Sequence, residues 1–103
     1  MDIGKAIREI RKALGIRRKE LAASAGISVT ALYNIEKNLS FPSKSTIESI
    51  CRALGVPVGF LLVFCVTEED VPKEKRQAFR CLIVPVKTFL LQGSVIIDGH
   101  EFK

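Results

Sequence analysis

The stretch GIRRKELAASAGISVTALYNIEKN, residues 15–38, decides how this chain folds. Two apolar sets at helical spacing flank Gly26: Leu21, Ala22 and Ala25 before it, and Ile27, Leu32 and Ile35 after it. A turn of only roughly three to four residues separates the two predicted helices, so they must cross at a steep angle. Gly26 suits this turn because glycine adopts a positive φ without a steric penalty from a Cβ. The pattern predicts a helix-turn-helix unit whose second helix covers about residues 28–36.

The segments on either side of this unit also carry helical patterns. Within the first two thirds of the chain, helices are expected over residues 2–14, 18–25, 28–37, 43–54 and 57–64. Ser28 and Ser43 stand just before two of these helices, where a hydroxyl can accept a hydrogen bond from a free backbone N–H. The resulting prediction is an all-α, five-helix domain over residues 1–66.

Residues 67–103 are predicted to form a C-terminal helical extension. Apolar residues keep helical spacing across 78–91, and Gly93 is expected to end this helix. Pro85 lies inside the pattern, where it should kink or break the helix because it lacks an amide hydrogen. A strand is the competing interpretation, since LIVPV at 82–86 is rich in β-branched residues. For the final ten residues, a short strand with a turn and a frayed tail both remain open.

The positive charge of the chain is concentrated in one half. The net charge is +5, and residues 1–64 hold ten Lys and Arg against five Asp and Glu. Residues 65–103 hold six of each sign. A basic half suits a polyanionic partner such as nucleic acid, whereas a neutral and apolar half suits a protein partner.

Cysteine and histidine usage argues against a metal site and against an enzyme. Cys51, Cys65 and Cys81 lie among apolar residues with no Cys-x-x-Cys pair, so we expect three buried thiols and no metal or cofactor. Cys81, which follows an arginine, is the one candidate for a redox-sensing thiol. His100 stands alone, without a phosphate-binding loop or nucleophile elbow. The apolar run at 56–66 is about half the length needed to span a bilayer, so a soluble, cytoplasmic protein is expected.

Residues 3–62 resemble the lambda-repressor-like helix-turn-helix family, which includes phage repressors and bacterial regulators. The resemblance rests on KELAASAG, ISVTALYNIEKN, a proline loop and TIESICRALGV, in that order. It implies sequence-specific binding of double-stranded DNA, usually by a dimer on an operator, with the second helix of the unit in the major groove. The family commonly has Thr-Gln where this chain has Arg17 and Arg18, and Arg18 can still hold a phosphate there.

The candidate DNA contacts lie on and beside the helix over 28–36. Base readers are expected on its outer face, near its N-terminus: Val29, Thr30, Tyr33 and Asn34. Asn34 suits a bidentate contact with adenine. Phosphate contacts are expected from helix ends and the following loop: Arg18, Ser28, Lys37, Asn38, Ser40 and Lys44.

Apolar residues beyond what five helices need to cover themselves predict a homodimer interface: Phe60, Leu61, Phe64, Phe79, Leu82, Ile83, Val86, Phe89 and Leu90. The alternative is that the extension folds back on its own domain. The chain is therefore expected to be a transcriptional repressor that binds a near-palindromic operator as a homodimer. Two other functions stay open: an antitoxin that represses its own operon and binds a toxin, and a protein-interaction module without operator binding. The concentrated positive charge favours DNA binding over the interaction module.

Overall fold

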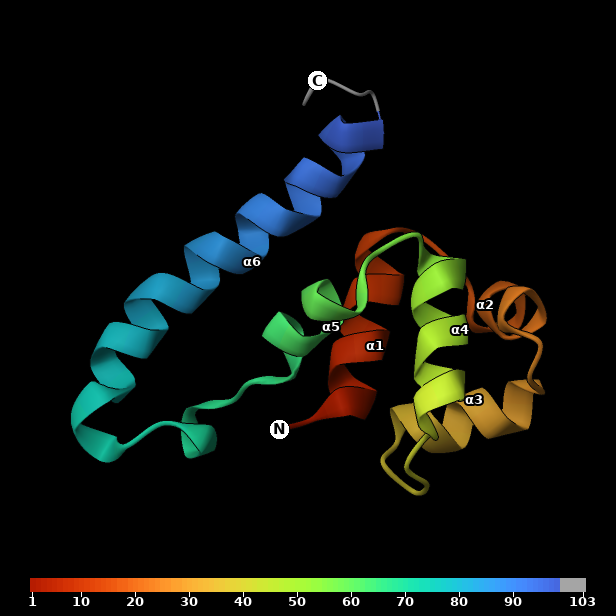
Figure 1. The fold of residues 1–103 in the computed structure, drawn as a ribbon, viewed down its shortest axis with the longest axis horizontal. Coiled ribbons are helices and arrows are strands. Elements are labelled where there is room, and N and C mark those ends of the chain that lie inside the picture. Colours follow the sequence, from red (N-terminus) through yellow and green to blue (C-terminus); the bar gives the residue numbers. More distant parts are fainter. Residues whose placement is uncertain (99–103) are drawn as a thin grey trace.

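The computed structural model describes residues 1–98. All regular secondary structure in this range is helical, as the sequence predicts. In chain order the elements are α1 (Ile3–Ala13), α2 (Arg18–Ala25), α3 (Val29–Glu36), α4 (Lys44–Leu54), α5 (Val58–Cys65), the short 3-10 turns η1 (Glu68–Asp70) and η2 (Lys73–Lys75), and α6 (Arg76–Asp98). Figure 1 shows α1 to α5 gathered into one body, while α6 runs diagonally past α5 as a separate arm.

The helix ends lie where the sequence places them. Gly26 ends α2 at φ 75°, in the left-handed region that glycine adopts without strain. The Ser28 hydroxyl accepts a hydrogen bond from the Ala31 amide at 3.0 Å, and the Ser43 hydroxyl accepts one from the Thr46 amide at 3.2 Å. Arg17 provides no such cap for α2. These caps fix the start of α3 and therefore the direction in which its first turn points.

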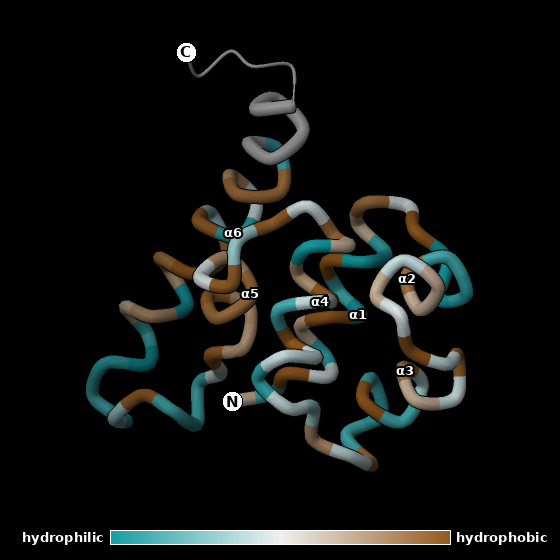
Figure 2. Tube along the Cα trace, turned by 45° about the vertical axis from the view of Figure 1, so that its right-hand side comes forward, coloured by the Kyte–Doolittle hydropathy of each residue, from teal (hydrophilic) through white to brown (hydrophobic). Residues whose placement is uncertain are grey.

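The core lies between α1, α3, α4 and α5, with α2 packed on α4. Its fully buried apolar side chains include Ile7, Ile10, Leu21, Leu32, Ile50 and Leu61. Ala22, one of the apolar residues that precede Gly26, is 1% exposed. Figure 2 shows that α5 is hydrophobic along almost its whole length, yet it buries one face, with Leu61, Phe64 and Cys65, while Leu62 stays exposed. A close-packed core of this kind holds α3 rigidly on the surface of the domain.

The expected end of the extension helix at Gly93 is wrong, and of the kink or break expected at Pro85 the break does not occur. Helix α6 runs without interruption from Arg76 to Asp98, so neither Pro85 nor Gly93 ends it, and the strand alternative is excluded. Pro85 is exposed, so the carbonyl of Cys81, which loses its helical partner, lies on the side that water can reach. Of the final ten residues, 94–98 continue the helix, and 99–103 lie outside the described residues.

Helix α6 has an inner and an outer apolar face. On the inner face Leu90 and Leu91 pack against the core of the domain, and the Lys87 ammonium lies 3.8 Å from Glu9 and 5.2 Å from the Phe64 ring. The extension thus folds back on its own domain in part. Its outer face is left open, with exposed Leu82, Val86 and Phe89.

Within residues 1–98 no single helix has the length and apolarity needed to cross a membrane. Helices α4 and α5 reach that composition only as a pair bent by 103°. Both helices contribute buried residues to the core of the domain.

Candidate nucleic-acid interface

Helix α3 buries one face and presents the other to solvent. Leu32 and Ile35 point into the core, at 0% and 5% exposure. On the opposite side Val29 is 44% exposed, Tyr33 is 41% exposed, and Thr30 is also exposed. Asn34, the fourth predicted base reader, is half-buried at the edge of this face. The four side chains therefore lie together on or beside one surface of α3, within its first six residues.

A buried ion cluster holds the C-terminal end of α3. The Glu36 carboxylate is fully buried, and Arg11 of α1 donates to it from Nε at 2.7 Å and from Nη2 at 3.0 Å. Arg18 of α2 donates to the same carboxylate from Nε and Nη2, both at 3.2 Å. Arg11 also donates to the carbonyl of Ile16. The cluster ties three helices together, because the buried carboxylate on α3 accepts hydrogen bonds from α1 and α2 at once.

The sequence pattern does not predict this cluster. Arg11 and Glu36 are charged residues that would ordinarily face solvent, yet both are buried, at 6% and 4% exposure. The two residues are 25 positions apart, and the pattern of α1 alone does not reveal that α3 crosses it there. The only sequence signal is an arginine next to the apolar stripe of α1, which is weak because arginine is common beside such stripes.

Tyr33 lies among cations. The guanidinium carbon of Arg18 is 5.2 Å from the centre of the Tyr33 ring, and the Lys37 ammonium is 5.7 Å from it. Both distances are within the range of a cation–π interaction, which extends to about 6 Å. The ring is thus held at the surface of α3 by the side chains of its neighbours.

The segment after α3 is anchored to the start of α1 by Asn38. Asn38 has a positive φ of 60°, its Oδ1 accepts a hydrogen bond from the Gly4 amide, and its Nδ2 donates one to Asp2. A Cβ at Gly4 would press on the carbonyl oxygens of Ile35 and Glu36. Hydrogen bonds from Asn38 and from the Lys5 amide lower the pKa of the Asp2 carboxyl. Both polar atoms of the Asn38 side chain already have hydrogen-bond partners in this anchor, which argues against the phosphate contact expected of it.

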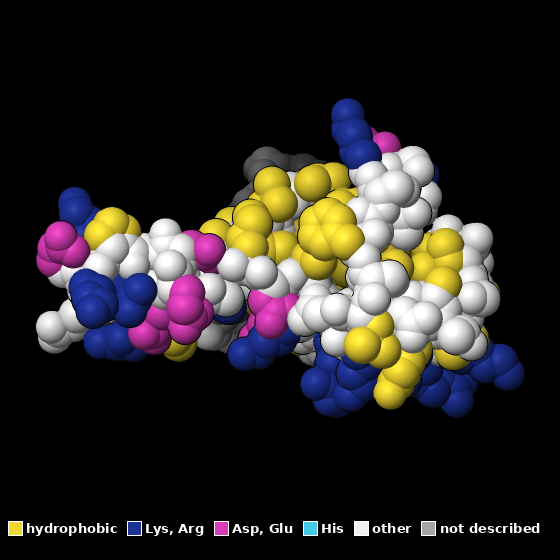
Figure 3. All heavy atoms as spheres, turned by 90° about the horizontal axis from the view of Figure 1, so that it is seen from below, with side chains coloured by type: hydrophobic (Ala, Val, Ile, Leu, Met, Phe, Trp, Pro, Cys, Tyr) yellow, Lys and Arg dark blue, Asp and Glu magenta, His cyan; other side chains and the backbone are white. Residues whose placement is uncertain are grey.

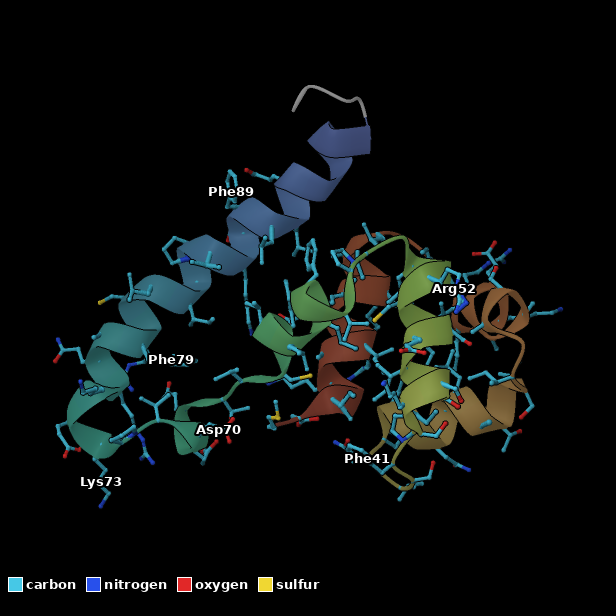
Figure 4. The ribbon with its side chains drawn as sticks, in the orientation of Figure 1. Phe41, Arg52, Asp70, Lys73, Phe79 and Phe89 are labelled. Atoms are coloured by element: carbon cyan, nitrogen blue, oxygen red, sulfur yellow. The ribbon has the colours of Figure 1, made fainter. Side chains whose placement is uncertain are left out.

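The remaining expected phosphate contacts flank α3. Ser28 stands at its N-terminus, while Lys37, Ser40 and Lys44 are exposed at its C-terminal end and in the loop that leads to α4. In the view from below, Lys and Arg side chains line one edge of the domain, whereas the other end of the molecule mixes acidic and basic side chains (Figure 3). The same loop carries exposed Phe41, which Figure 4 shows projecting from the lower edge of the domain.

The expected dimer residues do not form one surface. Leu61 and Phe64 are 0% and 3% exposed, so they belong to the core of their own domain. Phe60 is half-buried against Phe64, and Leu90 packs on the core. Phe79 and Ile83 are half-buried and line a cleft of about 550 Å³ beside η1. The three that remain exposed on α6 are Leu82, Val86 and Phe89, and Figure 4 shows Phe89 on the side of α6 that faces away from α5.

The expectation that all three cysteines are buried is wrong for one of them. Cys51 and Cys65 are buried, and burial raises the pKa of both thiols. Cys81 is exposed on α6. Leu82, the apolar residue next to it, belongs to the open face of that helix, which the sequence pattern could not distinguish from a buried one.

Comparison with known proteins identifies the class of protein that this geometry defines. A family model described as "Helix-turn-helix" matches residues 7–61, and the chain belongs to this family, in its lambda-repressor-like form. Members are DNA-binding transcriptional regulators, a class that is generally not enzymatic.

The relatives of this chain include regulators and repressors of phage and bacterial origin. The immunity repressor protein of Bacillus phage phi105 is 34% identical over 79 residues, which are 77% of this chain and 52% of that protein. An uncharacterised HTH-type transcriptional regulator of Mycobacterium tuberculosis is 36% identical over 95% of this chain and 38% of its own length. The crystal structure of the clp gene regulator ClgR from C. glutamicum matches with a TM-score of 0.61 at 30% identity, covering 62% of this chain and 83% of that one. The chain thus spans about half the length of the curated relatives, or less.

Proposed function

We propose that the chain is a repressor that binds a near-palindromic operator as a homodimer, with α3 of each copy in the major groove. We assign DNA binding to residues 1–66 and dimerisation to residues 67–103. The observation that carries the proposal is the exposed face of α3, where Val29, Thr30 and Tyr33 stand free with Asn34 beside them. The similarity to a phage immunity repressor supports repression over activation.

In this proposal the base-reading side chains and the phosphate contacts have different effects. Asn34 pairs with adenine, so Asn34→Ala should cost about 1–3 kcal/mol on a site selected from random DNA and little on a scrambled duplex. Equal weakening on both duplexes would remove Asn34 from base readout. Ser28, Lys37, Ser40 and Lys44 contact phosphates, which position the protein without reading sequence.

Helix α4 offers a matched pair of cations for testing the phosphate contacts. Lys44 is at the end of α4 next to α3, and Arg52 is exposed at the other end of the same helix (Figure 4). Lys44→Ala should weaken cognate and scrambled duplexes alike and lower the slope of log K against log salt by about one. Arg52→Ala should leave the slope unchanged. If the two variants behave alike, the DNA does not lie along α3.

The dimer is proposed to form through the outer face of α6. Leu82, Val86 and Phe89 recur at spacings of four and three, which places them on one stripe of the helix. They are 66%, 42% and 61% exposed. In a monomer, a continuous exposed apolar stripe of this kind promotes aggregation, whereas in a dimer it can form the interface. A two-fold axis there would allow the two α3 helices to lie roughly 34 Å apart, one turn of DNA.

Analytical ultracentrifugation of two charge variants tests this dimer interface. Phe89→Asp should convert the full chain to a monomer at micromolar concentration, because two carboxylates would face each other across an apolar interface. Thr88→Asp is the control, since Thr88 is exposed on the same helix but off the stripe. A wild-type chain that is monomeric at that concentration would refute the dimer, and a dimeric Phe89→Asp variant would move the interface elsewhere.

A further inference from the structure

Arg18, at the start of α2, does not project freely into solvent. Its Nε and Nη2 both lie 3.2 Å from Oε1 of Glu36, and its side chain is 30% exposed. The Glu36 carboxylate is itself fixed, because it is buried and receives two further hydrogen bonds from Arg11. A guanidinium that is bound through two nitrogens to a fixed carboxylate has a fixed orientation.

The orientation of Arg18 places its guanidinium beside the base-reading face. The guanidinium carbon is 5.2 Å from the centre of the Tyr33 ring, while Tyr33 remains 41% exposed. The exposed Lys37 ammonium lies 5.7 Å from the same ring, but within the described residues its side chain has no hydrogen bond or ion pair that would fix it. Arg18 is therefore the link between the buried cluster and the one aromatic side chain on the exposed face of α3.

We propose that Arg18 is a positioning residue. Glu36 fixes the Arg18 guanidinium, which in turn holds the Tyr33 ring in place and so makes Tyr33 a specificity-determining side chain of α3. This inference rests on the proposed function, since it concerns how α3 reads an operator. A ring that is fixed before binding loses little conformational freedom when it meets a base, and a fixed ring accepts fewer wrong bases than a mobile one.

This role differs measurably from that of a phosphate contact, which the sequence predicts for Arg18. A phosphate contact adds the same affinity on every duplex and adds about one to the salt slope. A residue that positions a base reader changes the ratio of affinities between cognate and scrambled duplexes and leaves the slope as it is. The structure favours the second role because two of the guanidinium nitrogens already bind Glu36.

Arg18→Met and Arg17→Met form a matched pair for this test. Each removes one positive charge from neighbouring positions, but Arg17 is 82% exposed and pairs with Glu20 at 3.4 Å instead of the cluster. We expect Arg18→Met to lower the ratio of cognate to scrambled affinity about tenfold, and Arg17→Met to leave that ratio unchanged. In a Tyr33→Ala background Arg18→Met should have no further effect on the ratio. Arg11 still pairs with Glu36 in the Arg18→Met chain, and circular dichroism checks that it folds.

A second measurement needs no DNA. The chain has one tyrosine and no tryptophan, so its ultraviolet fluorescence reports Tyr33 directly. Acrylamide should quench this fluorescence faster in Arg18→Met than in wild type or Arg17→Met, because the ring loses a neighbour that covers it.

The outcomes separate this inference from the proposed function. If Arg18→Met weakens both duplexes equally and lowers the salt slope by about one more than Arg17→Met, Arg18 is a phosphate contact and the inference is overturned. Unchanged quenching in Arg18→Met also overturns it. A wild-type chain that prefers no duplex refutes the proposed function and the specificity role with it, whereas the quenching experiment still decides whether Arg18 holds the ring.

Discussion

Replacing Glu36 by glutamine should be among the most damaging conservative changes in this protein. The side chain is fully buried and accepts four hydrogen bonds from two arginines, Arg11 and Arg18. Glutamine keeps the shape but removes the negative charge, so two guanidinium groups are left without an anion. Breaking a buried ion pair by removing one partner costs about 3–5 kcal/mol.

The size of this loss follows from the exposure of the two arginines. The side chain of Arg11 is 7% exposed and has little access to water, whereas the side chain of Arg18, at 30%, can recover part of its hydration. The amide oxygen of glutamine can still accept one of the bonds. We therefore expect the lower end of the range, about 3 kcal/mol, against a total stability of about 5–15 kcal/mol for a domain of this size.

Urea unfolding of the full chain at pH 7 and one fixed protein concentration measures this loss. Glu48→Gln is the control, since Glu48 is exposed on α4, and it should change the free energy of unfolding by less than about 0.5 kcal/mol. Arg18→Met should cost about 1 kcal/mol, because Glu36 keeps its pair with Arg11. A loss below about 1 kcal/mol for Glu36→Gln would refute the reasoning, since it would mean that the cluster is hydrated in solution.

Three further predictions concern stability, pH and thiol reactivity. Gly4→Ala should lower the free energy of unfolding by about 1–3 kcal/mol, because the new Cβ would meet backbone carbonyl oxygens. Gly59→Ala, with open space around it, should not lower this free energy. Equal effects of the two substitutions in thermal unfolding would contradict this packing. The pKa of the Asp2 carboxyl is lowered in the folded state, so its contribution to stability should be complete above about pH 4 and disappear as the pH falls through the folded-state pKa. Urea unfolding of the wild type and of Asp2→Asn over this pH range should show the difference. A thiol reagent should label Cys81 quickly and the other two cysteines only on unfolding, and three fast thiols would contradict the buried positions.

The first five helices could be predicted from the sequence because their signals are local. Gly26 and Gly55 occupy left-handed positions at φ 75° and 77°, and Ser28 and Ser43 cap the helices that follow them. Apolar spacing in each segment then determines which face points inward, as Leu32 and Ile35 do in α3. The outward face of α3, with the predicted base readers, follows from the same spacing.

The extension could be predicted only in part. The pattern over 78–91 gives a helix, but whether Pro85 breaks it depends on whether the freed carbonyl faces water or protein, and only the packing of α6 decides that. Nor does spacing distinguish an apolar face that meets α5 from one that meets solvent. Phe64 and Phe89 look alike in the sequence, and the fold buries the first and exposes the second.

The sequence by itself determined the helix-turn-helix unit, its caps and the residues on the outer face of α3, since each of these depends on contacts within a few residues. The tertiary structure decided which charges are buried. Arg11 and Glu36 are 25 residues apart, and Arg18 could bind phosphate or protein equally well by its chemistry. Only the crossing of α1, α2 and α3 brings the three together, because an ion pair between distant residues exists only where the fold places both ends within hydrogen-bond distance.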